Sequence, residues 1–382
     1  MSIPLALGLL AAAIWLVLLV FRGGFWLARE RDDRDAPPEP ARWPSVVAVV
    51  PARNEADVIG RSIGSLLAQD YPGPFRVVLV DDGSTDGTAA AASAATGRAA
   101  LEVLPGAPLP RGWTGKLWAL EQGVRHATAG DTPDFVLLTD ADIGHDPGNL
   151  RALVARAEAG RLSLVSLMAE LSCAIAAERF LIPAFVFFFA MLYPFSWVAD
   201  PRRRTAAGAG GCMLVRREAL ERAGGIAVIR TAIIDDCALA RRLKAQGPVW
   251  LGLTRRARSL RPYGGVGEIG RMVSRSAYAQ LGYSPLLLAG TVAGMVVTYL
   301  LPPALALFGT GMAAAAGLAA WTMMALAFQP MLRFYRASPL WGAALPVIGA
   351  AYTFFTLQSA VQLWRGRGGM WKGRAQAMAG GA

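Results

Sequence analysis

A long stretch without any charged residue constrains this chain more than any other feature. No Asp, Glu, Lys or Arg lies between Ser284 and Pro330, which is room for two membrane-spanning helices of about 20 residues each. Two more apolar runs cover residues 3–21 and about 340–364. Hydrophobic residues make up 54% of the chain and charged residues only 17%, whereas soluble domains are about a quarter charged. We therefore expect a multi-pass membrane protein and exclude a purely soluble, disordered or disulfide-scaffold chain.

The arginines beside these runs predict how the chain is oriented. The first apolar run is followed by four arginines, Arg22, Arg29, Arg31 and Arg34. By the positive-inside rule, residues 1–22 are therefore expected to form a transmembrane helix that leads to a cytoplasmic linker, 23–44. A cleaved signal peptide is the alternative, although its positive charges would precede the apolar run. The loop at 333–336 and the basic tail 365–382 are also expected to be cytoplasmic. Three crossings within 284–364 cannot put the 333–336 loop and the tail on the same side of the membrane. The number of C-terminal spans therefore stays open.

The net charge of +11 suits a membrane surface better than nucleic acid. Much of it is arginine flanking apolar runs, where an anionic leaflet would attract it. No basic stripe is interleaved with aromatic residues, so no nucleic-acid partner is expected. The three cysteines, Cys173, Cys212 and Cys237, match no zinc spacing.

Between the first span and residue 284 the chain alternates strand and helix patterns. Apolar, β-branched runs at 45–52, 75–80 and 134–139 predict buried strands. Helical spacing from Val58 to Leu67 and an Ala-rich stretch at 89–96 predict the helices between them, with Ser84 or Thr85 capping the second. This order predicts an α/β domain over 45–283 built on a mostly parallel, Rossmann-like sheet.

Polar motifs follow each predicted strand, where ligands bind in such sheets. Asp140 and Asp142 follow the third strand, and carboxylate pairs of this kind suit Mg²⁺ or Mn²⁺ shared with substrate phosphates. Asp82 follows the second strand and could accept hydrogen bonds from a nucleobase or ribose. For both, ordinary turn chemistry is the alternative.

Two further motifs could take part in the same chemistry. Asp236 follows Asp235 near a predicted helix start, and a neighbouring carboxylate can raise a pKa into the range of a general base. Helix-start acids without a function are the alternative. Lys116 lies beside Gly112 and Gly115 and could reach a diphosphate, or it could be an exposed loop lysine.

The apolar segment 180–199 is long enough to cross a membrane but contains Pro183 and Pro194. A crossing there would put the acidic motifs on opposite sides of the membrane. We therefore expect an interfacial segment facing a lipid or a buried core helix.

Seven motifs in order resemble family 2 glycosyltransferases of the GT-A fold. They are PARNE (51–55), QDYPGP (69–74), VDDGSTDGT (80–88), GKLWALEQG (115–123), TDADI (139–143), GGCMLVRREAL (210–220) and IDDCALARRLKAQG (234–247). Within that family the chain is similar to the bacterial hopene-associated glycosyltransferases, which are related to ceramide glucosyltransferases. The resemblance implies an enzyme in the inner (cytoplasmic) membrane of a bacterium, with its catalytic domain in the cytoplasm.

The resemblance also implies site roles. Asp236 would be the catalytic base, deprotonating an acceptor hydroxyl that attacks with inversion. Asp142 and Asp140 would hold a Mg²⁺ or Mn²⁺ ion, with Asp140 also near the ribose. The expected nucleotide-sugar-binding residues are Pro51, Arg53, Glu55, Asp82, Lys116, Asp140, Asp235 and Arg275.

The expected reaction is transfer of one sugar from a nucleotide-sugar, with a UDP-sugar favoured, to a lipid for which a hopanoid is a candidate. Processive synthases carry Gln-x-x-Arg-Trp after the base, whereas only Arg275 of the Met272–Ser276 stretch matches that pattern. The alternatives are a polyprenyl-phosphate or polysaccharide glycosyltransferase, or a non-catalytic membrane scaffold of the same fold.

Overall fold

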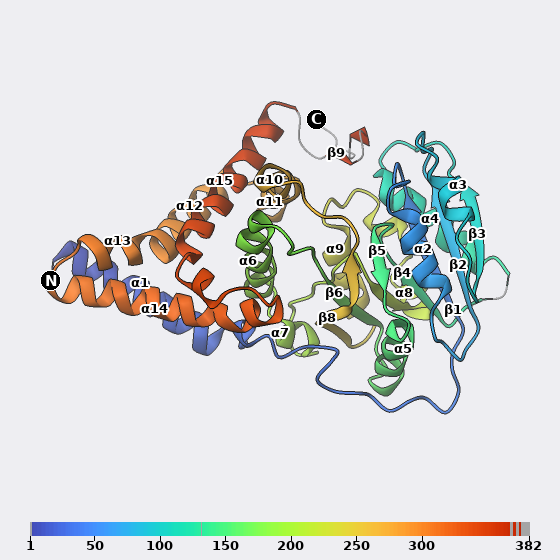
Figure 1. Cartoon of the computed structure of the whole chain (residues 1–382), viewed down its shortest axis with the longest axis horizontal. Coiled ribbons are helices and arrows are strands. Elements are labelled where there is room, and N and C mark those ends of the chain that lie inside the picture. The colour runs from blue at the N-terminus through green and yellow to red at the C-terminus, as the bar shows by residue number, and fades with distance from the viewer. Residues whose placement is uncertain (1, 131, 367–369, 372–373, 376–382) are drawn as a thin grey trace. The chain divides into compact units, whose positions relative to one another are not determined.

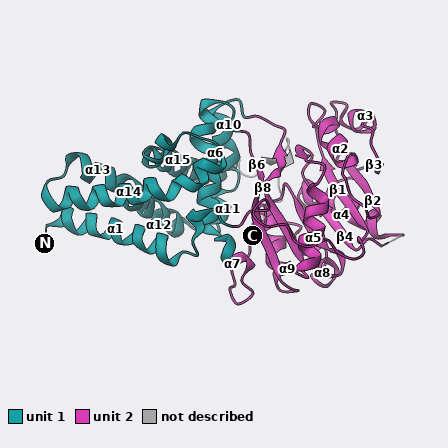
Figure 2. Cartoon of the chain, turned by 60° about the horizontal axis from the view of Figure 1, so that its bottom comes forward, with its two compact units in different colours: residues 1–29, 173–196, 263–368 teal, residues 30–172, 197–262, 369–382 magenta. Residues whose placement is uncertain are grey.

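The computed structural model describes residues 2–130, 132–366, 370–371 and 374–375. The chain forms two compact units, which are drawn in different colours in Figure 2. The sheet unit comprises residues 30–172, 197–262 and 369–382, and the helical unit comprises residues 1–29, 173–196 and 263–368. The chain therefore passes between the units five times along its length.

The sheet unit is built on an eight-stranded mixed sheet in the order β3-β2-β1-β4-β7-β6-β8-β5. Strands β1, β2, β3 and β4 are mutually parallel, as are β6 and β8, whereas β7 runs antiparallel to β4 and β6, and β5 antiparallel to β8. The strands are β1 (Val46–Ala52), β2 (Phe75–Asp81), β3 (Ala100–Pro105), β4 (Phe135–Leu138), β5 (Ile143–His145), β6 (Leu164–Glu170), β7 (Met213–Arg216) and β8 (Val249–Ser259).

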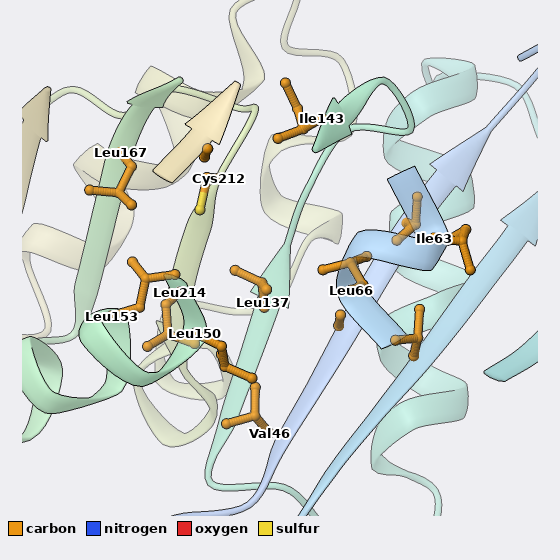
Figure 3. Close-up of a cluster of buried hydrophobic side chains, with 14 of the residues drawn as sticks. Val46, Ile63, Leu66, Leu137, Ile143, Leu150, Leu153, Leu167, Cys212 and Leu214 are labelled. Atoms are coloured by element: carbon orange, nitrogen blue, oxygen red, sulfur yellow. The ribbon is translucent and has the colours of Figure 1, made fainter. Parts of the chain in front are cut away.

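Helices cover both faces of this sheet. The core on one face joins alternate residues of β1 to α2 and α5, as Val46, Ile63, Leu66, Leu150 and Leu153 show in Figure 3. On the other face α4 packs so closely that Gly123 leaves no room for a Cβ atom beside Val49 and Val80. The helices of this unit are α2 (Ile59–Leu67), α3 (Thr88–Ser93), α4 (Gly115–Thr128), α5 (Asn149–Ala159), α7 (Phe195–Ala199, shared with the helical unit), α8 (Arg217–Arg222), η2 (Ala227–Ile229) and α9 (Asp235–Lys244).

The predicted strands and the α/β class are confirmed, with two local corrections. The strand predicted at 134–139 is β4, because β3 (Ala100–Pro105) was not expected; it lies at the sheet edge, where its partly exposed side chains weaken the apolar signal. Helix α3 begins after Gly87, whose φ is +87°, and it has no side-chain cap. The cap predicted at Ser84 or Thr85 is wrong because both residues hydrogen-bond to Asn54 instead.

The helical unit packs by close approach of small residues. A Cβ atom on Gly8 of α1 would lie 3.1 Å from Ala316 of α14, and one on Gly317 would lie 2.7 Å from the Pro302 carbonyl. Small residues let helix backbones approach each other in this way in membranes. The helices are α1 (Ile3–Phe21), η1 (Phe25–Leu27), α6 (Ala176–Leu192), α10 (Val266–Ser274), α11 (Ala277–Gln280), α12 (Pro285–Met295), η3 (Val296–Leu300), α13 (Leu301–Phe308), α14 (Gly311–Phe334), η4 (Pro339–Gly342) and α15 (Leu345–Trp364).

Among the described residues, three helices are long and apolar enough to cross a membrane: Ile3–Phe21, Pro285–Phe308 and Gly311–Phe334. The expected third C-terminal run forms α15 but is not among them. Within the expected segment 180–199, helix α6 includes Pro183 and buries most of its apolar side chains in the helical unit. Most of the basic tail lies outside the described residues.

Candidate active site

The turn after β4 carries the two predicted metal-binding carboxylates. Asp140 and Asp142 flank buried Ala141, and the Ile143 amide donates to the Asp140 carbonyl at 3.2 Å. Strand β5 then starts at Ile143 and pairs with β8 (Figure 1). The Asp142 carbonyl accepts from the Leu260 amide at 2.7 Å. The turn is therefore held from both sides, and both carboxylates lie at the carboxyl edge of the sheet.

Lys116 joins motifs that are far apart in the sequence. Its Nζ lies 2.8 Å from Asp140 Oδ1 and 3.1 Å from Asp235 Oδ2. Lys116 is in the first turn of α4, and Asp235 is the first residue of α9. Burial acts to lower the pKa of Lys116, but Asp140 and Asp235 outweigh it and raise that pKa above its usual value. Lys116 is thus a fixed positive charge rather than an exposed loop lysine.

Asp236 lies in a pocket partly closed by backbone. Its Oδ2 accepts from the Gly210 amide at 3.0 Å, and its Oδ1 accepts from the Cys237 amide at 2.7 Å. Burial first, and then the charge of Asp235, raise the pKa of Asp236 to about 6, with Lys116 opposing the rise. A carboxylate with a pKa near 6 can accept a proton at neutral pH.

A small cavity of about 20 Å³ lies beside these groups. The polar part of its lining comes from Lys116, Asp140, Gly210, Asp235 and Asp236. The apolar part includes Leu117, Leu120, Leu138 and Met213. The acids and the lysine that the sequence suggested separately are therefore brought together by the fold, beside Gly210.

The loops after β1 and β2 hold each other through side chains. The Asn54 amide donates to Ser84 Oγ at 2.9 Å, and Asn54 Oδ1 accepts from the Thr85 amide at 2.9 Å. The Glu55 amide donates to Thr88 Oγ1 at 2.8 Å. Asn54 has a φ of +52°, in the left-handed region that asparagine tolerates best among non-glycine residues.

These loops carry the other predicted nucleotide-binding residues. Arg53 donates to the Asp82 carbonyl and, at 3.2 Å, to that of Gly83; its Nη1 lies 3.9 Å from Asp82 Oδ2. Asp82 and Glu55 are buried, and Pro51 lies in β1 opposite Val80. Arg275 follows α10 in the helical unit, and its assignment to nucleotide binding stays a prediction.

Arg261 is a site residue that the sequence reasoning missed. It follows β8 and pairs with Glu55, with Asp57 at 3.3 Å, and with Asp142 through Nε at 3.8 Å. It lies outside the acidic motifs, in a basic stretch where several arginines look alike. Only the pairing of β8 with β5 brings this arginine to the Asp142 turn.

The carboxylates fit a divalent cation that is shared with substrate. No group of three or more His, Cys, Asp or Glu residues able to hold a metal occurs among the residues described. Mg²⁺ is commonly held by one or two carboxylates plus substrate phosphates, and Asp140 and Asp142 provide two. Burial first, and then Asp140 and Glu55, raise the pKa of Asp142 to about 6, a cost that a bound cation would offset.

Part of the sheet unit matches a known protein family. Residues 47–224 match the model of the family described as Glycosyl transferase family 2. Residues 47–224 are thus similar to family 2 glycosyltransferase domains, and the sheet unit that contains them has a GT-A-like mixed sheet.

Individual curated relatives match a shorter part of the chain. Two curated 4,4'-diaponeurosporenoate glycosyltransferases of Staphylococcus aureus, from strains bovine RF122 / ET3-1 and MRSA252, are 35% and 34% identical over 99 residues, or 26% of this chain. The chain spans about a quarter of the length of these relatives, since the match covers 24% of each.

A solved structure shares the fold over nearly the whole chain. It is the mannosyltransferase PcManGT from Pyrobaculum calidifontis in complex with GDP-Man and Mn²⁺. The TM-score is 0.58 at 21% identity, and the match covers 95% of this chain and 99% of that one.

Proposed function

We propose that this protein is a membrane-bound inverting glycosyltransferase that transfers a single sugar from a nucleotide-sugar to a lipid. One observation carries the proposal. Lys116 bridges Asp140 and Asp235 at 2.8 Å and 3.1 Å, and Asp236 lines the same cavity. A fixed cation and a carboxylate of raised pKa thus lie next to the candidate metal ligands, where a diphosphate leaving group and an acceptor hydroxyl would have to meet.

Each of the clustered residues has a separate role in the proposed reaction. Asp236 takes the proton of the acceptor hydroxyl as the new bond forms between that oxygen and the anomeric carbon, while the bond from that carbon to the diphosphate breaks. Lys116 balances negative charge developing on the departing diphosphate. Asp140 and Asp142 would hold Mg²⁺ or Mn²⁺, which supplies further electrostatic stabilisation of the leaving group when bound.

The nucleotide would bind across the loops after β1 and β2. The side-chain hydrogen bonds between Asn54 and residues 84–85 keep these loops in one geometry. Asp82, Glu55 and Arg53 provide the polar groups for base and ribose, with Pro51 beside them. Asp235 holds Lys116, and Arg275 is proposed as a further contact to diphosphate or acceptor.

The lipid acceptor is supported by the composition of the chain and by the names of its relatives. Three helices are long and apolar enough to cross a membrane, and the curated relatives are named for the acceptor diaponeurosporenoate. We propose the same class of acceptor, an apolar lipid, with a hopanoid as one candidate. A UDP-sugar is favoured as donor, and a GDP-sugar is also to be tested. The catalytic unit is proposed to lie in the cytoplasm at the bacterial inner membrane, where nucleotide-sugars are found.

Nucleotide release tests this function. Purified full-length protein in detergent with Mn²⁺ is given UDP-, GDP- and dTDP-sugars, with and without bacterial lipid extract, beside the Asp236→Asn variant. Lipid-stimulated release from one donor, lost in Asp236→Asn, would support the enzyme and identify its donor. Absence of release from every donor by folded protein would contradict the proposed reaction and favour the scaffold alternative.

A further inference from the structure

Arg261 connects the expected nucleotide end of the site to the expected metal end. Its guanidinium contacts Glu55 and Asp57 from the loop after β1, and Asp142 from the turn after β4. The Arg261 side chain is about one-third exposed, and Glu55 is buried. One planar group with several donors therefore holds carboxylates from two loops that are not adjacent in sequence.

We infer that Arg261 makes binding of the divalent cation depend on the donor's diphosphate; this rests on the proposed function. The guanidinium is 3.8 Å from Asp142 Oδ2, so a divalent cation on that carboxylate would lie close to a fixed positive charge. Repulsion between like charges at such a distance is several times stronger in a partly buried site than in water. Arg261 thus disfavours the cation alone.

The diphosphate reverses this effect. It brings negative charge to the same place, and an arginine fork is well matched to phosphate oxygens. Arg261 would then contact the diphosphate, and Asp142 would hold the cation. Cation and diphosphate should consequently bind cooperatively, and linkage requires each to strengthen the other by the same factor.

The variants separate this role from a merely structural one. Removing the charge in Arg261→Gln should tighten Mn²⁺ binding to the free protein about tenfold and weaken nucleoside diphosphate binding by about the same factor, since charge-assisted contacts have this magnitude. The shifts have opposite signs. Loss of structure would weaken both. Arg261→Lys keeps the charge but loses the fork, so Mn²⁺ alone should bind as in the unaltered protein while the diphosphate binds more weakly.

The experiment uses the full-length protein in detergent without any acceptor. Mn²⁺ binding is measured by electron paramagnetic resonance, with and without UDP or GDP, and nucleotide binding by calorimetry. Arg258→Gln is the matched control, because Arg258 lies on β8 just before Arg261, is about half exposed and pairs with Asp146 rather than with the site. It should change neither affinity.

Opposite shifts in Arg261→Gln with an unchanged Arg258→Gln would support the inference. Unchanged or weaker Mn²⁺ binding in folded Arg261→Gln would overturn it, and so would tighter Mn²⁺ binding in Arg261→Lys. Either result leaves the proposed function in place. If the unaltered protein binds neither UDP nor GDP in the presence of Mn²⁺, the proposed function fails and this inference fails with it.

Discussion

The Gly210 amide donates to Asp236 Oδ2 at 3.0 Å, so a backbone group helps to orient the candidate base. A Cβ atom at Gly210 would lie 3.2 Å from Lys116 Nζ and 3.7 Å from the Asp236 Cβ. The absence of a side chain at 210 therefore lets the lysine and the aspartate occupy the same small space.

Gly210→Ala should consequently reduce turnover more than stability. The added methyl group must shift Lys116 Nζ by a few tenths of an ångström, whereas its distance from Asp236 is ordinary van der Waals contact. Displacement of a catalytic group by about 1 Å can cost about 100-fold in rate, so we expect this smaller shift to cost about tenfold. This fall in kcat should come with little change in the melting temperature, as measured by nucleotide release and by thermal unfolding in detergent. Gly64→Ala is the control, because no atom lies within 4 Å of a Cβ there; it should keep full activity. Equal turnover in both variants would contradict the placement of Gly210.

The rate should rise with pH through about 6. Asp236 must be ionised to accept a proton, and its pKa is about 6. Below that pH the carboxyl is protonated and kcat should fall about tenfold per pH unit; above it kcat should level off. The measurement is kcat between pH 5 and pH 8 at saturating donor and Mg²⁺, which keeps Asp142 bound to metal. Asp236→Asn should show about 10²–10⁴-fold lower kcat without this inflection. An inflection that persists in that variant would assign the titration to another group.

Asp142→Ala should lose metal dependence and donor binding together. If Asp142 is a ligand of the shared cation, removing it weakens the contact between metal and diphosphate. We expect donor affinity in the presence of Mn²⁺ to fall at least about tenfold, a loss comparable to a charge-assisted interaction. Chelating the metal with EDTA should reduce affinity in the unaltered protein and have no further effect in the variant. Donor affinity equal to that of the unaltered protein would remove Asp142 from the ligand set.

Glu178 should be a stabilising residue of the helical unit. Its buried carboxylate accepts from the backbone amides of Ala174 at 2.7 Å, Ile175 at 3.1 Å and Tyr263 at 2.8 Å. Glu178→Gln puts an amide donor where an acceptor is needed, which should cost about 1.5–3 kcal/mol of unfolding free energy.

Thermal unfolding in detergent measures the Glu178→Gln effect as a lowered melting temperature. Glu268→Gln is the control, because Glu268 is partly exposed and accepts from the Gly264 amide at 2.7 Å. A melting temperature no lower for Glu178→Gln than for Glu268→Gln would contradict the role of the buried carboxylate.

The sequence by itself determined three central strands, the apolar helices and most candidate groups. Apolar runs predicted β1, β2 and β4 because strands buried on both faces must be apolar throughout, and the acids after them mark the carboxyl edge of a parallel sheet. Uncharged stretches likewise predicted the apolar helices, since lipid excludes charge.

Only the tertiary structure decided which of these groups meet. Lys116 contacts both Asp140 and Asp235 because α4, the β4 turn and α9 reach the same edge of the sheet. Arg261 reaches Asp142 because β8 pairs antiparallel with β5. Such contacts depend on pairing between strands and packing between helices distant in sequence. Local patterns of hydrophobicity and charge encode the elements but not these distances.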